Sequence, residues 1–407
     1  EVPEIKDVLS FTSISPRIGL SYDIFGNGKT ALKLSYARYS EQVPVMWFSE
    51  VSPAVMGQYE FNWWDLNENG QPDSPGTDRY EYRWSLGDFK LPDPDYLRKM
   101  VDPDLHAPVH NEFTAGIEHQ LFKDFAVKLT YVHKKKTDFF GWGKYDLATE
   151  QYWYTLEQAP EWYVPFTTTV PAYGAFPEQT VTVYFMSADS PYETMVYIKT
   201  NFPEAYTKYD GLELSFDKRF TNGWSLGGSA TFSKTTTFTL GDSPNDFVNT
   251  PGRDGYDVPF IFKLYGTFDL PYGFVASFFL NYRVGYPWGR SVSIVPPDDW
   301  AEANNVVPWS VWVMLEPNGK RREQDYTNFD FHLEKEFKLP FGTLAAFVDI
   351  YNLFGNRYVN YGLNPISEWF PVAEGTNQGT YTMDYNYNRV TSIDATRTFK
   401  FSIRYKF

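Results

Sequence analysis

The stretch of sequence best suited to chemistry is an acidic, amide-rich segment, "WWDLNENGQPD", at residues 63–73. Side-chain oxygens recur at alternate positions, and a glycine follows where the chain must turn sharply. This spacing can wrap oxygen ligands around calcium, a hard cation that prefers carboxylate and carbonyl groups. The predicted ligands are the side chains of Asp65, Asn67, Asn69 and Asp73 and the backbone carbonyl of Gln71.

The segment departs from an EF-hand at its twelfth position. An EF-hand needs a bidentate glutamate there, whereas this chain has Gly76, with Asp78 two residues later as a substitute. The alternative is a polar turn in which side chains bond to the nearby backbone and no ion is held. We expect calcium to be structural if it binds, holding a long loop in one shape.

Aromatic side chains between the expected strands form a second set of candidate binding groups. They are Trp63, Trp64, Trp153, Tyr154, Trp162 and Tyr163. Such rings could stack on a sugar or another planar ligand. The alternative is that they pack a long loop against itself or against a partner protein. The sequence contains no nucleophile elbow, P-loop or H-E-x-x-H motif, so we do not expect an enzyme.

Composition narrows the class of protein. The 407 residues include no cysteine, which excludes a disulfide framework and thiolate metal sites. Acidic residues outnumber basic ones 51 to 36, which argues against nucleic acid as a partner. Aromatic residues make up 19% of the chain, an unusually large share.

Strict alternation of apolar and polar residues is the main structural signal. In "GFVASFFLNYR" (273–283), Phe274, Phe278 and Leu280 share one face with other apolar residues, and polar residues such as Asn281 and Arg283 lie on the opposite face. The sequence predicts about eleven strands of this kind. They span approximately 14–25, 29–39, 112–122, 125–137, 209–220, 224–236, 259–270, 273–286, 327–338, 343–354 and 396–407.

The connections between these strands alternate in length. Short turns at 25–29, 122–125, 220–224, 270–274 and 339–343 alternate with long segments at about 40–107, 138–207, 237–257, 288–324 and 356–394. Aromatic residues bracket nearly every short turn. Short periplasmic turns, long extracellular loops and aromatic girdles are typical of outer-membrane β-barrels. The predicted fold class is therefore all-β, an antiparallel transmembrane barrel facing outer-membrane lipid.

Four segments carry a more specific resemblance. They are "SPRIGLSYDIFGNGKTALKLSYARY" (15–39), "YDGLELSFDKRFTNGWSLGGSATFSK" (209–234), "FKLYGTFDLPYG" (262–273) and "VDIYNLFGNRY" (348–358). Together they resemble the barrel of TonB-dependent outer-membrane receptors, in particular the subgroup with an N-terminal carboxypeptidase-regulatory-like domain. The resemblance covers essentially the whole chain and follows the order of the C-terminal half of such a barrel.

The last strand ends on an aromatic residue with no polar tail. Its apolar face carries Phe399, Phe401, Ile403, Tyr405 and Phe407. This pattern resembles the C-terminal signal by which the outer-membrane assembly machinery recognises barrel substrates. A lipid-facing strand that ends in the periplasmic girdle accounts for it.

The strand count predicts an incomplete barrel. The first and last strands both run toward the periplasm, so they cannot pair antiparallel with each other to close the wall. The resemblance implies that residues 1–407 are the C-terminal part of a receptor barrel of about 22 strands. The N-terminal barrel half and the plug would then lie outside this chain, and TonB would be a partner of the whole protein.

Two classes of function follow from this interpretation. One is import of an unidentified solute through a TonB-dependent receptor in the outer membrane of a Gram-negative-type bacterium, with the long loops extracellular. The other is a structural or adhesive barrel whose large loops dock partner proteins at the cell surface. A third and weaker alternative is a secreted, aromatic-rich sugar-binding sandwich or glycosidase.

Overall fold

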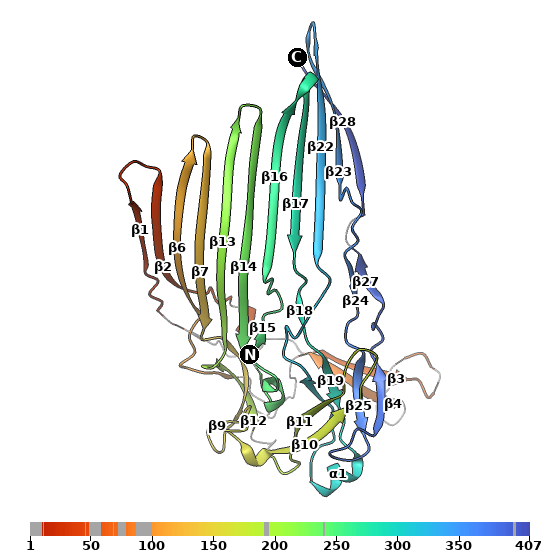
Figure 1. Cartoon of the computed structure of the whole chain (residues 1–407). Helices are drawn as coiled ribbons and strands as arrows, with labels where there is room; N and C mark the ends of the chain where they lie inside the picture. The colour runs from red at the N-terminus through yellow and green to blue at the C-terminus, as the bar shows by residue number, and fades with distance from the viewer. Residues whose placement is uncertain are drawn as a thin grey trace.

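The computed structural model describes residues 10, 12–44, 46–48, 58–67, 69–71, 79–86, 100–190, 195–238, 241–393 and 396–407. One long antiparallel sheet dominates this part of the chain (Figure 1). Its strands follow one another in chain order: β1 (Arg17–Asp23), β2 (Thr30–Ser40), β6 (Val109–Phe122), β7 (Phe125–Thr137), β13 (Tyr206–Thr221), β14 (Trp224–Phe238), β16 (Phe260–Leu270), β17 (Phe274–Arg283), β22 (Tyr326–Leu339), β23 (Gly342–Tyr351) and β28 (Thr398–Lys406). The short strand β15 (Gly252–Arg253) pairs with the end of β14.

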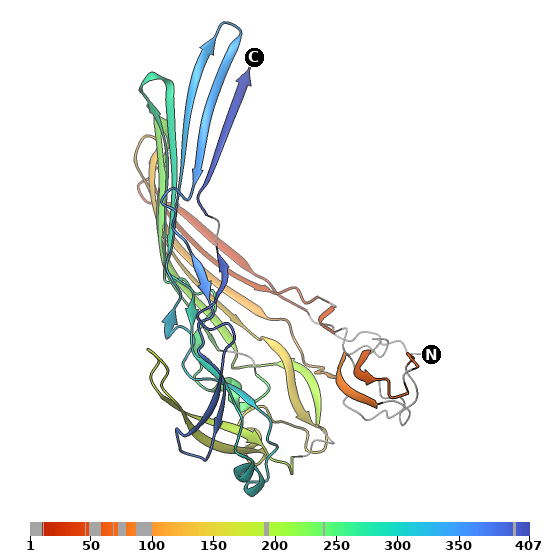
Figure 2. The same cartoon turned by 90° about the vertical axis from the view of Figure 1, so that its right-hand side faces the viewer.

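These strands confirm the predicted all-β architecture. Each predicted strand is present within a few residues of its expected bounds, and each pairs antiparallel with its neighbours. Seen from the side, the sheet is curved rather than flat (Figure 2). No helix among the described residues is long and apolar enough to cross a membrane.

One face of the sheet is apolar and exposed. The strand register places Leu32 opposite Ile117, Ile117 opposite Leu129, and Leu129 opposite Leu214, so aliphatic side chains form a row across four strands. Leu214 is 52% exposed and Phe401, on the last strand, is 78% exposed. Apolar rows that remain uncovered by protein are what a lipid-facing barrel wall requires.

The opposite face is polar. Lys33 on β2 forms an ion pair with Glu118 on β6, with 2.6 Å between nitrogen and oxygen. Near the other edge, Arg404 on β28 forms an ion pair with Glu334 on β22. The first pair joins adjacent strands and the second reaches across β23, so paired polar groups lie on this face as the predicted lumen wall requires.

The short turns lie together at one end of the sheet, at the top of Figure 1. The turn between β13 and β14 shows how sequence encodes them. Asn222 and Gly223 have φ angles of 54° and 79°, the left-handed conformations that a tight hairpin requires and that Asn-Gly adopts readily. The Lys218 ammonium then donates hydrogen bonds to the carbonyl oxygens of Thr221 and Trp224, at 3.0 and 3.1 Å.

The five long connections emerge at the opposite end. They span residues 41–108, 138–205, 239–259, 284–325 and 352–397, and are called the first to fifth long connections below. They contain further short strands that the sequence analysis did not predict. These are β3 (Gln58–Trp64), β4 (Arg79–Leu86), β5 (Met100–Val101), β8 (Phe140–Asp146), β9 (Gln151–Tyr152), β10 (Tyr163–Val170), β11 (Gln179–Met186), β12 (Met195–Asn201), β18 (Pro287–Trp288), β19 (Ser291–Ile294), β20 (Val311–Met314), β21 (Arg321–Arg322), β24 (Val359–Tyr361), β25 (Ile366–Pro371), β26 (Gly379–Met383) and β27 (Val390–Ile393).

The second, fourth and fifth long connections fold together into one loop lobe with its own hydrophobic core. Buried side chains from all three connections meet there, among them Val183, Ile294 and Trp369. Strands β19 and β25, from different connections, pair in parallel, and the helix α1 (Asp298–Ala303) contributes buried Ala301 to the same core. The Trp369 indole donates a hydrogen bond to the Thr168 hydroxyl at 2.8 Å, joining the fifth connection to the second.

The orientation of the sheet can be tested by labelling single cysteines, because the chain has none of its own. We expect Glu302→Cys, on exposed α1, to react with a membrane-impermeant maleimide on intact cells. Phe341→Cys lies in a short turn and is 86% exposed, so it should react only after the outer membrane is permeabilised. Labelling of Phe341→Cys on intact cells would show that the short turns face the outside of the cell, and would contradict the predicted orientation.

Candidate functional site

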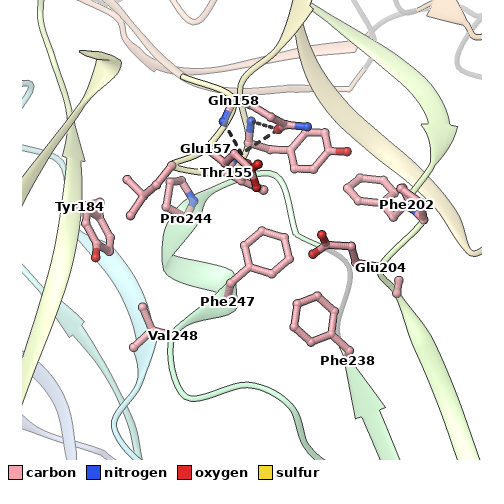
Figure 3. A pocket seen from close by; sticks show the side chains of 14 residues that line it. Thr155, Glu157, Gln158, Tyr184, Phe202, Glu204, Phe238, Pro244, Phe247 and Val248 are labelled. Atoms are coloured by element: carbon pink, nitrogen blue, oxygen red, sulfur yellow. Dashed lines mark hydrogen bonds between the residues drawn. The ribbon is translucent and has the colours of Figure 1, made fainter. Parts of the chain in front are cut away.

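A pocket of about 680 Å³ opens between the second and third long connections (Figure 3). Its lining includes Tyr154, Phe202 and Glu204 from the second connection, Phe238 at the end of β14, and Phe247 from the third connection. This volume lies within the range of about 300–1,000 Å³ that small-molecule sites occupy.

The wall from the third connection is held by a buried amide. Asn245, in the 3₁₀ helix η3 (Pro244–Phe247), is 4% exposed. Its side chain accepts a hydrogen bond from the Tyr184 backbone N–H and donates one to the Tyr184 carbonyl oxygen, both at 2.8 Å, much as a neighbouring strand would. The Ser243 hydroxyl accepts from the Asn245 N–H at 3.2 Å, and the Asp246 carboxylate accepts from the Ser243 N–H at 3.0 Å. This capping box fixes the segment that carries Phe247.

The facing wall is a turn stabilised by one glutamine. The Gln158 side-chain oxygen accepts hydrogen bonds from the backbone N–H groups of Tyr154 and Thr155, at 3.3 and 3.2 Å. The Tyr154 ring packs against Phe202, with 4.8 Å between ring centroids. Burial raises the pKa of the Tyr154 hydroxyl, and the negative charge of Glu204 raises it further, so this hydroxyl is neutral at physiological pH.

The pocket offers binding groups rather than reactive ones. Its lining combines aromatic ring faces with hydroxyl groups and two carboxylates, Glu157 and Glu204. Both glutamates are exposed at the rim. Such a mixture of apolar surface and a few polar groups is typical of a site that selects a small molecule by shape and charge.

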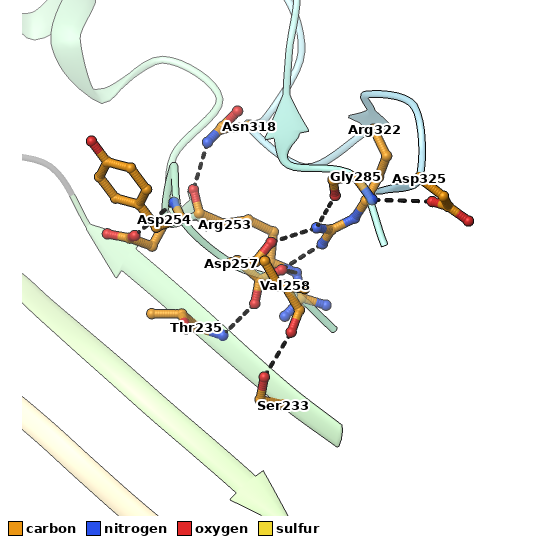
Figure 4. A network of polar contacts seen from close by, with 11 residues as sticks. Ser233, Thr235, Arg253, Asp254, Asp257, Val258, Gly285, Asn318, Arg322 and Asp325 are labelled. Carbon is orange, nitrogen blue, oxygen red and sulfur yellow. Dashed lines mark hydrogen bonds and ion pairs between the residues drawn. The ribbon is translucent and has the colours of Figure 1, made fainter. Parts of the chain in front are cut away.

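A buried carboxylate ties the third connection to the fourth, close to the end of the main sheet (Figure 4). Asp257 is fully buried and accepts a hydrogen bond from the Thr235 backbone N–H on β14 at 2.5 Å. The same carboxylate forms an ion pair with Arg322 from the fourth connection. Asn318 adds a bond of 2.7 Å to the Arg253 carbonyl oxygen. These contacts anchor the base of the third connection, which carries the pocket wall.

A second buried network lies within the loop lobe. Glu316 is 4% exposed and accepts two hydrogen bonds from the Arg321 guanidinium, at 2.7 and 2.8 Å. Arg290 is 2% exposed and donates to the Pro177 carbonyl oxygen at 2.7 Å, joining the fourth connection to the second. Burial by itself would raise the pKa of Glu316, but the hydrogen bond and charge of Arg321, with the charge of Arg290, hold that pKa below its usual value.

The predicted calcium ligands belong to the connection between β3 and β4, directly after β3. The structure describes Asp65, Asn67, Asn69 and Gln71, whereas Asp73 lies outside the described residues. The two carboxylate oxygens of Asp65 accept from the backbone N–H groups of Asn69 and Gly70, at 3.2 and 2.6 Å, and the Asn67 side-chain oxygen accepts from the Asn69 N–H at 3.0 Å. Gly70 has a φ of 74°, a conformation that favours glycine. This geometry suits both alternatives, the calcium loop and the polar turn, so calcium stays a prediction.

The candidate loop tryptophans occupy two environments. Trp63 and Trp64 on β3 are 37% and 40% exposed, and the Arg79 guanidinium lies 4.7 Å from the Trp64 ring centre. Trp153 is 1% exposed, and Trp162 packs against the small core that contains it. In this structure the second pair packs the second long connection against itself, which was the alternative to ligand stacking.

The apolar residues of the last strand lie on the exposed face of β28. Phe399, Phe401, Ile403, Tyr405 and Phe407 are all exposed, and β28 pairs along its length with β23. The alternation predicted from the sequence is therefore present. Their role as an assembly signal stays a prediction.

Sequence reasoning found one pocket residue and missed the others. Tyr154 was among the loop aromatics, but nothing local distinguishes Phe202, Glu204 or Phe247 from other residues of long loops. They come together only because η3 docks on β11 through Asn245.

Comparison with known proteins identifies a family. The profile of the "Outer membrane beta barrel domain" family matches residues 9–286, more than half of the chain. No curated protein matches.

Several solved structures resemble this one. The outer membrane transporter YddB from Escherichia coli is 14% identical, with a TM-score of 0.45 over 99% of this chain and 42% of its own. The ferripyoverdine receptor of Pseudomonas aeruginosa is 12% identical, with a TM-score of 0.45 over 97% of this chain and 33% of its own. The ferric preacinetobactin receptor BauA from Acinetobacter baumannii is 13% identical, with a TM-score of 0.44 over 97% of this chain and 36% of its own. The chain thus spans well under half the length of these proteins.

Calcium binding at the β3–β4 turn can be tested on the native protein in outer-membrane vesicles. If calcium binds, chelation should increase protease cleavage between Arg38 and His106 and leave the main sheet intact, because the ion stabilises only the state that presents its ligands. Asp65→Ala should reproduce this effect without chelator. If neither treatment changes cleavage and the purified protein contains no calcium, the segment is only a polar turn.

The Glu316 network predicts a pH-dependent stability of the loop lobe. A carboxylate with a depressed pKa stabilises the fold above its unfolded pKa, and this contribution is lost as the pH falls through the folded pKa. Glu316→Gln should cost about 1–3 kcal/mol at pH 7, since it weakens two buried hydrogen bonds to a charged group. Urea unfolding followed by tryptophan fluorescence should show a lower midpoint at pH 7, and the difference from wild type should shrink at about pH 3. Glu302→Gln, on the exposed helix, should change neither midpoint.

Proposed function

This chain belongs to the outer membrane β-barrel domain family, and on that premise we propose that it is part of the barrel of a TonB-dependent receptor that imports a solute. It is an outer membrane protein and not an enzyme. The proposal is carried by the loop lobe, in which three long connections share one core at the end of the sheet away from the short turns. A folded lobe with a pocket beside it is suited to capturing a ligand before passage.

The main sheet supports passage through a lumen. Its polar face carries the Lys33–Glu118 and Glu334–Arg404 ion pairs, and its apolar face is exposed for lipid. Within the described residues β1 and β28 are the edges of the sheet, and both run toward the short-turn end. In lipid such edges need partners, because unpaired backbone groups there cannot bond to water. We propose that further strands and a plug of the whole receptor supply them, and that TonB supplies the energy.

The adhesive alternative predicts a different phenotype. A barrel that only docks partner proteins would leave the uptake of solutes unchanged when it is lost. The comparisons do not favour this alternative, and the pocket of about 680 Å³ suits a small molecule better than a protein surface.

Import can be tested by comparing three strains of the native bacterium: the parent, a strain without this gene, and a strain without TonB. We expect mass spectrometry of spent medium to reveal at least one solute that the parent removes and both mutants leave behind. The full-length gene should restore removal. A version lacking residues 288–324 should reach the outer membrane, as judged by heat-modifiable migration, yet fail to restore uptake. Identical depletion of all solutes by parent and mutants, together with altered surface attachment, would favour the adhesive function.

A further inference from the structure

The pocket beside the loop lobe is built from two pairs of aromatic rings. Tyr154 and Phe202 form one pair, and Phe238 and Phe247 form the other, with ring centroids 5.6 Å apart and planes inclined by 27°. Figure 3 shows the Glu204 carboxylate lying among the rings of Phe202, Phe238 and Phe247. An exposed carboxylate beside aromatic rings can share a cation with them, because the ring faces are also electron-rich.

The charge of this pocket has one sign. Its only charged lining residues are Glu157 and Glu204, and neither forms an ion pair within the described part of the chain. The whole chain carries a formal net charge of −15. A field of this sign attracts cations and raises their local concentration.

Aromatic faces and carboxylates select the same kind of ligand. A cation over a ring face is attracted by the negative face of the π system, and the attraction grows when water is excluded. An anion would meet repulsion from the glutamates and would also lose hydration in an apolar setting. A neutral aromatic ligand would gain ring contacts alone. The lining therefore discriminates by charge as well as by shape.

We propose that this pocket binds a small organic cation, namely an amine or quaternary ammonium group joined to an apolar or aromatic body. The cationic group lies beside Glu204, against the stacked rings of Phe238 and Phe247. The apolar body packs against the side of the pocket formed by Val248 and Tyr184. This inference rests on the proposed receptor function, for which it names the chemical class of solute.

Three probes of matched ring size test the charge preference on the full-length protein, purified in detergent from outer membranes. They are benzyltrimethylammonium, benzyl alcohol and phenylacetate, which are cationic, neutral and anionic. Ligand-observed NMR titration should rank their affinities in that order. Benzyltrimethylammonium should bind at least roughly threefold more tightly than benzyl alcohol, as a partly exposed cation–π site would give. Equal binding of all three probes, or stronger binding of phenylacetate, would overturn the proposal.

Two variants locate the binding site. Glu204→Gln removes the charge from an exposed residue with little risk to folding, and should reduce benzyltrimethylammonium affinity by roughly twofold to fivefold, as loss of an exposed charge pair would give. It should leave benzyl alcohol binding unchanged. Phe247→Leu should weaken both probes, the cation more strongly. Glu302→Gln, a matched exposed glutamate on α1, should change neither affinity. If Glu204→Gln and Glu302→Gln behave alike, the cation does not bind in this pocket.

The binding experiment and the uptake experiment can fail separately. Probe binding by purified protein needs neither TonB nor passage through the barrel. If the purified protein does not prefer the cationic probe but TonB-dependent uptake is observed, the proposed ligand class is wrong and the receptor function is supported. If binding is selective and depends on Glu204, but solute uptake is the same in the parent and the mutant strains, the cation site is supported and import is not its function.

Discussion

The need to pair every backbone group inside a membrane governs this structure. Hydrocarbon offers no water to an unpaired N–H or C=O group, so strands that cross it must lie in a continuous ladder. Between its two edge strands, the main sheet meets this requirement with neighbours in chain order and antiparallel pairing throughout. Because every second connection is a tight turn, such as the one at Asn222 and Gly223, all the long segments must emerge at the same end. The loop lobe is a consequence of that geometry.

Once gathered at one end, the long connections are stabilised in the manner of a soluble domain. Val183, Ile294 and Trp369 come from three different connections and share one core. Hydrogen bonds between buried polar groups join the connections, as the bonds of Arg290 to Pro177 and of Trp369 to Thr168 illustrate. The pocket depends on this order, since its walls are fixed by Asn245 against β11 and by Asp257 against β14. Walls fixed in this way would hold the rings in place before the proposed ligand binds, which would lower the entropic cost of binding.

The main strands were predictable from sequence because lipid imposes a strict period of two over eight residues or more, as in the strand from Phe274 to Arg283. Strand β11 alternates as well, with Val181, Val183 and Phe185 buried, yet its partners could not be inferred. Pairing of β19 with β25 joins residues more than seventy positions apart, and no local pattern records it. The same limit applies to the site. Trp153 has the side chain of a ligand-binding residue but lies in a core, whereas Glu204 and Phe247 gain their role only from tertiary contacts.

The direction of the two edge strands constrains how this wall can close. Within the described residues, eleven antiparallel neighbours in a row place β1 and β28 in the same direction, so closing an antiparallel barrel would take an odd number of further strands between them. Eleven more would give the barrel of about 22 strands that the sequence resemblance implies. Eleven strands and an odd number of further strands add up to an even total, which agrees with the even strand numbers of bacterial barrels. The exposed apolar residues of β28, including Phe401 and Ile403, would then continue a lipid-facing surface across the junction.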